Sequence, residues 1–247
     1  MSNKEDINTY CSYFKERLEE IKTIENRLYR KLFIVAMIDS LARAVYTNKE
    51  NRERFINFIR NFSDWQDCNR VSLPQLALNL QSDSEIRDSE LRREVEERLR
   101  RWQSVKIYWI NEVDPGEKEI KKLTTTLESI RLIEKSTHAE LLYIYRNHLV
   151  HEFREPGHPP EISSDDTTPY YCSVTELNNK ISDRSYSGEK LRELMRTSRR
   201  TWELVYPVGF FVSIVENSLA ILELYLEEKD LNPYSSYQFG SIWRPNR

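Results

Sequence analysis

The sequence predicts an all-α protein, a single-domain helical bundle spanning residues 1–247. Only five glycines occur in the chain, so few tight turns are available and long helices are favoured. Several long segments repeat apolar residues at three- and four-residue steps, which is the spacing of one helix face. Charged residues make up 31% and aromatic residues 11% of the chain, a composition typical of globular rather than disordered proteins.

Charge and cysteine content narrow the class of protein. The 37 Lys and Arg residues against 40 Asp and Glu give a net charge of −3, which excludes a strongly basic coat but permits a local basic groove. Cys11, Cys68 and Cys172 lie far apart in no ligand-like spacing, as reduced cytoplasmic thiols do. The N-terminus lacks the apolar stretch of a secretory signal. The most apolar run, residues 204–215, is shorter than the roughly 20 residues of a membrane span. We expect a soluble, cytoplasmic protein without membrane association.

The first elements are predicted to be long helices. Residues 5–47 contain almost no helix breakers, and residues 52–62 carry phenylalanines on one side. One helix face in the first segment is formed by Phe14, Leu18, Ile21, Ile24 and Leu28. From Leu32 onward the chain is apolar nearly all round, which indicates an enclosed central helix. Asp39 and Arg43 stand four residues apart within it and are expected to pair.

The middle of the chain continues this pattern. Pro74 suits the first turn of a short helix, and residues 83–102 alternate charges as a solvated amphipathic helix does. Residues 105–110 fit a short strand or an extended connector. Asp114, Pro115 and Glu117 form a good helix start, with Asp114 as the cap, and this helix is expected to run to about residue 135.

A second capping signal, Thr137 with Glu140, begins the helix that carries the most informative residues. This helix is expected to stop before Pro156, and a loop rich in Pro, Ser and Asp follows over residues 155–171. Helix is predicted again over residues 187–195, and residues 201–229 are predicted to form a long apolar helix bent at 207–209. The tail, residues 232–247, is aromatic but irregular.

Residues 143–154, Y-I-Y-R-N-H-L-V-H-E-F-R, combine an apolar face with unusual polar residues. At about 100° per residue, a core stripe is formed by Leu142, Tyr145, Leu149 and Phe153. Asn147 and His151 fall on the opposite side, and Arg146 lies about 140° from His151. A plain solvent face would carry Lys and Glu instead, so this face is suited to a partner or a ligand.

Arginine and histidine together suit cleavage of RNA without a metal. Imidazole exchanges a proton near neutral pH, and guanidinium binds a phosphate through two hydrogen bonds and neutralises developing charge. RNA supplies its own nucleophile, the 2′-hydroxyl. One Arg and one His per chain make a sparse site, so a two-fold dimer that places two such pairs face to face would supply both a base and an acid.

The segment R-N-H-L-V-H at residues 146–151 resembles the R-N-x-x-x-H motif of the HEPN superfamily, whose ribonucleases occur in toxin–antitoxin, abortive-infection and CRISPR systems. The resemblance covers this helix alone. It implies an all-helical HEPN-like bundle, a homodimer formed across the motif helix, and a metal-independent endoribonuclease without cofactors. It assigns catalysis to Arg146, Asn147 and His151, with Asn147 positioning the other two. The implied partners are RNA and an antitoxin or regulatory protein, and the implied role is a toxin or an anti-phage defence effector.

Other residue groups allow further interpretations. His148, His151 and His158 suggest zinc, but no cysteine lies nearby and no H-E-x-x-H pattern occurs, so no metal site is predicted. A helical stripe of Arg192, Arg196 and Arg199 is either a solvated face or, together with His148, a surface that binds the RNA backbone.

Two questions stay open at the level of sequence. Tyr170 and Tyr171 either anchor the long loop or stack on bases. The alternative function is a non-catalytic helical dimerisation or RNA-binding module, in which Arg146 and His151 only join an interface network.

Overall fold

A computed structural model of the chain describes residues 3–82, 88–103, 106–157, 161–162, 166–175 and 200–235. These residues are mostly helical, as predicted, and include one small sheet. The chain forms two compact units. Unit 1 contains Met1–Cys68, Ala139–Pro156 and Val208–Arg247, and unit 2 contains Asn69–His138 and Gly157–Pro207. Both units are assembled from segments far apart in the sequence, so no single point separates them, and the expected single domain stays a prediction.

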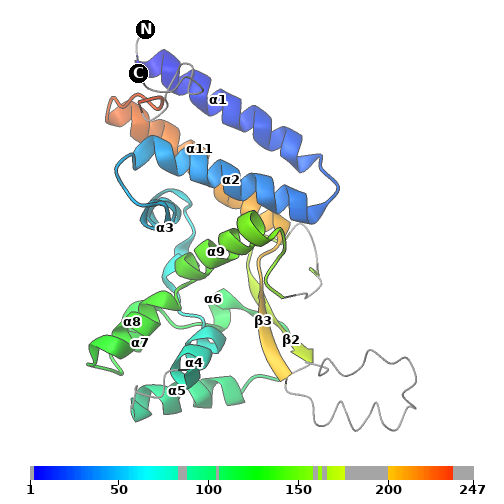
Figure 1. Cartoon of the computed structure of the whole chain (residues 1–247), viewed down its shortest axis with the longest axis vertical. Helices are drawn as coiled ribbons and strands as arrows, with labels where there is room; N and C mark the ends of the chain where they lie inside the picture. Colours follow the sequence, from blue (N-terminus) through cyan, green and yellow to red (C-terminus); the bar gives the residue numbers. More distant parts are fainter. Residues whose placement is uncertain are drawn as a thin grey trace, which may run out of the picture. The chain divides into compact units, whose positions relative to one another are not determined.

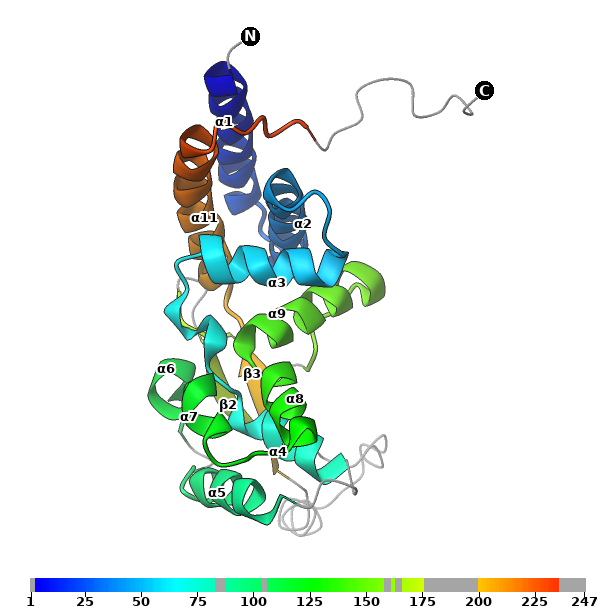
Figure 2. The ribbon, with the colours of Figure 1, turned by 90° about the vertical axis from the view of Figure 1, so that its left-hand side faces the viewer.

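Unit 1 is a helical bundle. Its helices are α1 (Asn3–Lys22), α2 (Arg27–Val45), α3 (Asn51–Phe62), α9 (His138–Asn147, which begins at the boundary with unit 2) and α11 (Val208–Glu228), and a π-helical turn, η2 (His148–Glu152), continues α9. α1, α2 and α11 lie side by side, and α3 runs across α2 and α11 (Figures 1 and 2). The single segment predicted over residues 5–47 is thus two helices, α1 and α2, joined by a short connection.

α2 is the enclosed helix that its composition predicts. Eight of its side chains are buried, and they face more than one direction around the helix axis. It packs against α1, α3, α11 and η2, all within unit 1. The side chain of Asn26 caps the helix by accepting a hydrogen bond from the Tyr29 amide. α2 therefore supplies the frame on which the other helices of this unit are placed.

α11 is long and apolar enough to cross a membrane by length and composition, and no other helix in the described ranges meets that test. Its packing gives another explanation for this composition. Nine of its residues are buried, and it contacts α1, α2 and α3. These contacts make α11 a core helix of unit 1. It begins at Val208, immediately after Pro207, so the bend predicted at 207–209 is the start of the helix.

None of the three cysteines, all of which lie in the described ranges, forms a disulfide. Cys11 and Cys68 are buried, and Cys172 is partly exposed. Burial raises the pKa of the Cys11 thiol to about 11, so this thiol stays protonated and unreactive near neutral pH.

Unit 2 packs short helices around an apolar core. Its helices are α4 (Leu73–Ser82), α5 (Ser89–Arg100), α6 (Ile110–Val113), α7 (Glu117–Lys121) and α8 (Leu127–Lys135), and a 3₁₀ turn, η1 (Gln66–Asn69), leads into the unit. The core is formed by Val71, Leu73, Leu76, Leu80, Leu91, Val95, Ile120 and Ile133. These side chains come mainly from α4, α5, α7 and α8. Each short helix has only a few apolar residues, and together they form one core.

A three-stranded antiparallel sheet in unit 2 corrects the all-α prediction. The strands are β1 (Tyr108–Trp109), β2 (Tyr170–Thr175) and β3 (Arg200–Val205), in the order β1-β2-β3. In the register, Cys172 faces Glu203 and Tyr171 faces Leu204. β3 was predicted to be the start of a helix, but T-W-E-L-V contains two β-branched residues and a tryptophan, which are types enriched in strands. Only pairing with β2, about 30 residues away, decides between the two states.

The helix predicted from Asp114 to about residue 135 is divided into two. α7 ends at Lys121, and α8 begins after Thr126, whose side chain accepts a hydrogen bond from the Ser129 amide. Asp114 is not the cap; Gly116 occupies that position. The Asp114 carboxylate is buried instead and receives hydrogen bonds from other segments of unit 2.

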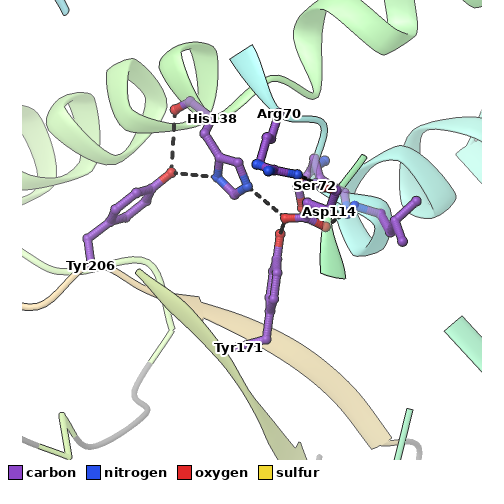
Figure 3. Close-up of polar contacts among 8 residues, drawn as sticks. Arg70, Ser72, Asp114, His138, Tyr171 and Tyr206 are labelled. Atoms are coloured by element: carbon purple, nitrogen blue, oxygen red, sulfur yellow. Dashed lines mark hydrogen bonds and ion pairs between the residues drawn. The ribbon is translucent and has the colours of Figure 1, made fainter. Parts of the chain in front are cut away.

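Those bonds form an enclosed polar cluster (Figure 3). His138 Nε2 lies 2.7 Å from Asp114 Oδ2, the Tyr171 hydroxyl donates to the same oxygen over 2.7 Å, and the Leu73 amide donates to Oδ1 over 3.1 Å. The Tyr206 hydroxyl lies 3.4 Å from His138 Nδ1. Burial raises the pKa of both tyrosines well above the usual value, so they stay neutral. One carboxylate thereby links α4, the end of α6, the first residue of α9 and β2.

We expect Asp114→Ala to lower the free energy of unfolding by about 3–5 kcal/mol, because it leaves His138, Tyr171 and the Leu73 amide without their buried acceptor. Tyr171→Phe removes one hydrogen bond and should cost about 1 kcal/mol. Urea unfolding measures both changes. The exposed neighbour Glu112 gives the control, Glu112→Gln, and equal stability of Asp114→Ala and this control would contradict the structural role.

Candidate functional site

The candidate site lies on the segment that follows the regular part of α9. α9 ends at Asn147, and the next five residues form the π-helical turn η2. Phe153 ends the turn in the left-handed conformation, with φ 57°, and its amide donates to the carbonyl of His148. A π-turn with a non-glycine residue at positive φ is unusual, and such features concentrate at functional sites.

The π-turn changes which side chains share a face. In a regular α-helix Arg146 and His151 point about 140° apart. The hydrogen bonds of a π-turn join residues five apart, which brings side chains at that spacing onto one side. Arg146 Nη1 lies 3.5 Å from His151 Nε2 and donates to Asn147 Oδ1 over 3.0 Å. The structure therefore brings Arg146, Asn147 and His151 together.

The same turn corrects one prediction about the core stripe. Leu142, Tyr145 and Leu149 are buried as expected, but the side chain of Phe153 is 57% exposed. The wider π-turn and the left-handed residue shift the phase of the helix after Asn147, so the four-residue spacing no longer places Phe153 on the core side. Its ring instead packs near that of Tyr29 on α2, at a centroid distance of 6.0 Å.

Arg146 is held on α2 by Asp39. Its Nε donates to Asp39 Oδ2 over 2.8 Å, and its Nη2 donates to the same oxygen. The Arg146 side chain is 13% exposed and lies over the Tyr143 ring, 5.9 Å from its centroid. Burial raises the pKa of the Asp39 carboxyl, and the hydrogen bond from Arg146 opposes that shift. The expected pairing of Asp39 with Arg43 is thus replaced by a pairing with the candidate catalytic arginine.

A second polar contact fixes the other end of the segment. Lys31, fully buried on α2, donates to Glu155 Oε2 over 2.8 Å and to the Tyr145 hydroxyl over 3.1 Å. The Tyr145 hydroxyl also donates to Glu155. Because Asp39 and Lys31 are eight residues apart on α2, the segment is attached to that helix at two points about 12 Å apart. Sequence reasoning gave Asp39 a different partner, Arg43, and missed Lys31 and Glu155. A lysine inside an apolar helix was the available signal for Lys31.

The remaining predicted RNA-binding residues have different outcomes. His148 Nδ1 lies 2.8 Å from Glu152 Oε1, so this imidazole is paired within its own turn. Arg192, Arg196 and Arg199, like His158, lie outside the described residues. Tyr170 and Tyr171 are buried in β2, which excludes stacking on bases and supports the anchoring interpretation.

Neither a metal site nor a second catalytic site is supported by the described residues. Within them, no group of three or more His, Cys, Asp or Glu side chains is arranged to hold a metal ion. The His138–Asp114 pair of unit 2 has catalytic residue types, but both side chains are fully buried and therefore cannot meet a substrate without opening the unit. The exposed His151 beside a partly exposed arginine remains the best-placed reactive pair.

Comparison with known protein families, curated proteins and solved structures finds no significant match. The site is therefore interpreted from its geometry and from the motif alone.

We expect Asp39→Asn to lower the free energy of unfolding by about 1–3 kcal/mol, because the largely buried Arg146 loses its charged acceptor. Adding Arg146→Gln to this variant should restore part of the loss, since no unpaired charge then remains. Glu53→Gln, which breaks an exposed pair with Lys49, is the matched control and should leave stability nearly unchanged. A loss no larger than that of the control, in thermal or urea unfolding, would show that Asp39 does not hold Arg146.

Proposed function

We propose that this chain is a metal-independent endoribonuclease of the HEPN type, with an HEPN-like helical fold in unit 1. The observation that supports it best is the contact of Arg146 Nη1 with Asn147 and with His151 Nε2. Asp39 occupies the Nε and Nη2 side of the guanidinium, so the Nη1 side remains directed toward the imidazole. A phosphate oxygen bound there would lie beside the group that transfers protons.

In the proposed reaction, the imidazole of His151 removes the proton of the RNA 2′-hydroxyl. The 2′-oxygen then attacks the adjacent phosphorus, and the bond to the 5′-oxygen breaks, which leaves a 2′,3′-cyclic phosphate. Arg146 stabilises the charge on the phosphate oxygens, and Asn147 orients Arg146. The leaving 5′-oxygen needs a proton from a second acid, which His151 of a partner protomer would supply in a homodimer.

Exposed apolar side chains around the motif support the dimer. Tyr29 and Phe33 on α2, Ile144 on α9 and Phe153 after the π-turn are between 44% and 57% exposed. Tyr29 contacts Phe153, and Phe33 lies one helical turn further along α2. Large apolar side chains grouped beside a reactive pair suit an interface that also completes the site.

The resemblance of the motif to HEPN ribonucleases also suggests a biological role. As an HEPN ribonuclease, the protein would act on cytoplasmic RNA as a toxin or an anti-phage defence effector. An antitoxin or another regulatory protein would then control it. The alternative, a non-catalytic dimerisation or RNA-binding module, is favoured by one observation: Asp39 already satisfies two donors of Arg146 and competes with a phosphate.

The activity test is cleavage of total RNA in EDTA. Wild type should cleave, and His151→Ala should lose at least about 100-fold in rate, the usual contribution of a general acid or base. His148→Ala should raise KM without lowering kcat if His148 only contacts the RNA backbone. Equal cleavage by wild type and His151→Ala would remove His151 from the mechanism. A silent wild type whose dimer is weakened by His151→Ala would favour the non-catalytic alternative.

The dimer has its own test. Phe33→Asp should convert the homodimer to a monomer in sedimentation velocity, because it places a charge among exposed apolar side chains. RNA cleavage should fall with dissociation if the partner supplies the acid. Leu224→Asp, at a 68% exposed apolar residue on α11, is the matched control and should leave both unchanged. An unaltered mass for Phe33→Asp would place the interface elsewhere.

A further inference from the structure

A small pocket adjoins the reactive pair on the α2 and α3 side. It has a volume of about 220 Å³. Its lining comes from three helices of unit 1: Asp39, Ser40 and Arg43 on α2, Asn51 and Arg54 on α3, and Arg146 on α9. Two of these residues, Asp39 and Arg146, also belong to the candidate site. The pocket therefore shares the side chain of Arg146 with the place where the scissile phosphate is proposed to bind.

The charges lining this pocket are unbalanced. Three guanidinium groups face one carboxylate, and that carboxylate is engaged by Arg146. Arg43 and Arg54 lie close enough to Asp39 to act on its pKa, although burial and Arg146 act more strongly. Across the described ranges, neither Arg43 nor Arg54 forms an ion pair of its own; Arg54 Nη2 donates to the neutral side chain of Asn51. Among the described residues, two positive charges in the pocket thus have no dedicated counter-ion.

The start of α3 adds to the positive potential. Asn51 is the first residue of this 12-residue helix and lines the pocket. The N-cap residue, Glu50, makes no side-chain hydrogen bond to the first turn within the described chain. The free amides of a helix N-terminus carry a partial positive charge that favours anions. Guanidinium groups and a helix N-terminus in one pocket therefore select the same kind of ligand.

The ligand chemistry follows from these donors. Guanidinium forks bind anions that offer several oxygens, above all phosphate, and Asn and Ser side chains add hydrogen bonds to phosphate or sugar oxygens. We propose that Arg43 and Arg54 bind a phosphodiester of the RNA backbone next to the scissile phosphate held by Arg146. This inference deepens the proposed function and rests on RNA being the ligand, but it does not require cleavage.

The test measures binding of a single-stranded 2′-O-methyl oligoribonucleotide, which lacks the nucleophile, to the full-length protein in EDTA. Fluorescence anisotropy over a range of salt concentrations gives both affinity and salt dependence. Arg43→Gln/Arg54→Gln should weaken binding at least about ten-fold. It should also reduce the slope of log affinity against log salt by about 1, because one phosphate contact is lost.

Arg27→Gln/Arg60→Gln is the matched control. It removes two exposed arginines from the same two helices, and Arg27 lies 16 residues from Arg43, about 24 Å along α2. The control should retain wild-type affinity and slope, and circular dichroism should show that both double variants are folded. Equal binding by the two double variants overturns the inference, as does a wild type that binds no RNA.

The two proposals fail in different ways. If the wild type binds RNA through Arg43 and Arg54 but cleaves none, the result supports the phosphate-binding pocket and contradicts the proposed ribonuclease activity. If the wild type cleaves RNA and Arg43→Gln/Arg54→Gln changes neither RNA binding nor KM, the result supports the ribonuclease activity and contradicts phosphate binding in the pocket.

Discussion

The attachment of the motif segment to α2 is the constraint on which the candidate site depends. Asp39 and Lys31 are charged residues in the largely apolar middle of α2, and each costs free energy unless it is paired. Both find their partners on the last turn of α9 and the chain after it: Arg146 for Asp39, and Tyr145 with Glu155 for Lys31. The need to satisfy one buried charge, Lys31, and one partly buried charge, Asp39, fixes the position of the arginine and of the chain on either side of the histidine.

The π-turn brings the side chains of Arg146 and His151 together once the segment is held on α2. With its ends held on α2, the segment contains one residue more per turn than an α-helix does, and the extra residue aligns Arg146 with His151. The left-handed Phe153 ends the turn and exposes an aromatic ring beside the pair. Backbone geometry of this kind carries a conformational cost, which the bonds to α2 offset. The site is thus pre-formed within unit 1.

The polar clusters of the two units differ in burial, and this difference indicates which cluster is structural and which can react with a ligand. Asp114 and His138 in unit 2 form a tighter and better-connected network than Arg146 and His151, yet they are enclosed on all sides. Such a network joins segments distant in the sequence and contributes to a unique packing. In unit 1 the Asp39 carboxylate is only partly buried, the histidine is exposed, and a basic pocket is lined in part by Arg146. Access to solvent and unbalanced positive charge point to ligand binding there.

The sequence by itself determined the elements whose signals are local. Helical periodicity and the lack of glycine gave the long helices α1, α2, α3 and α11, and the polar residues around Arg146 stood out because an ordinary helix face would carry Lys and Glu. Tertiary structure decided what depends on partners distant in the chain. β3 is a strand because β2 pairs with it, and Asp114 is a buried acceptor rather than the expected helix cap because the donors of Leu73 and His138 lie beside it.

The same division applies to the candidate site. The identities of Arg146, Asn147 and His151 can be read from the sequence, but ideal helix geometry separates the arginine from the histidine by about 140°. Their contact exists because a π-turn replaces the last α-helical turn, and that turn is held by Asp39 and Lys31, more than 100 residues earlier. The pocket of Arg43 and Arg54 likewise requires α2, α3 and α9 to meet. Local periodicity carries no information about such meetings, because they arise from the pairing of buried charges across the fold.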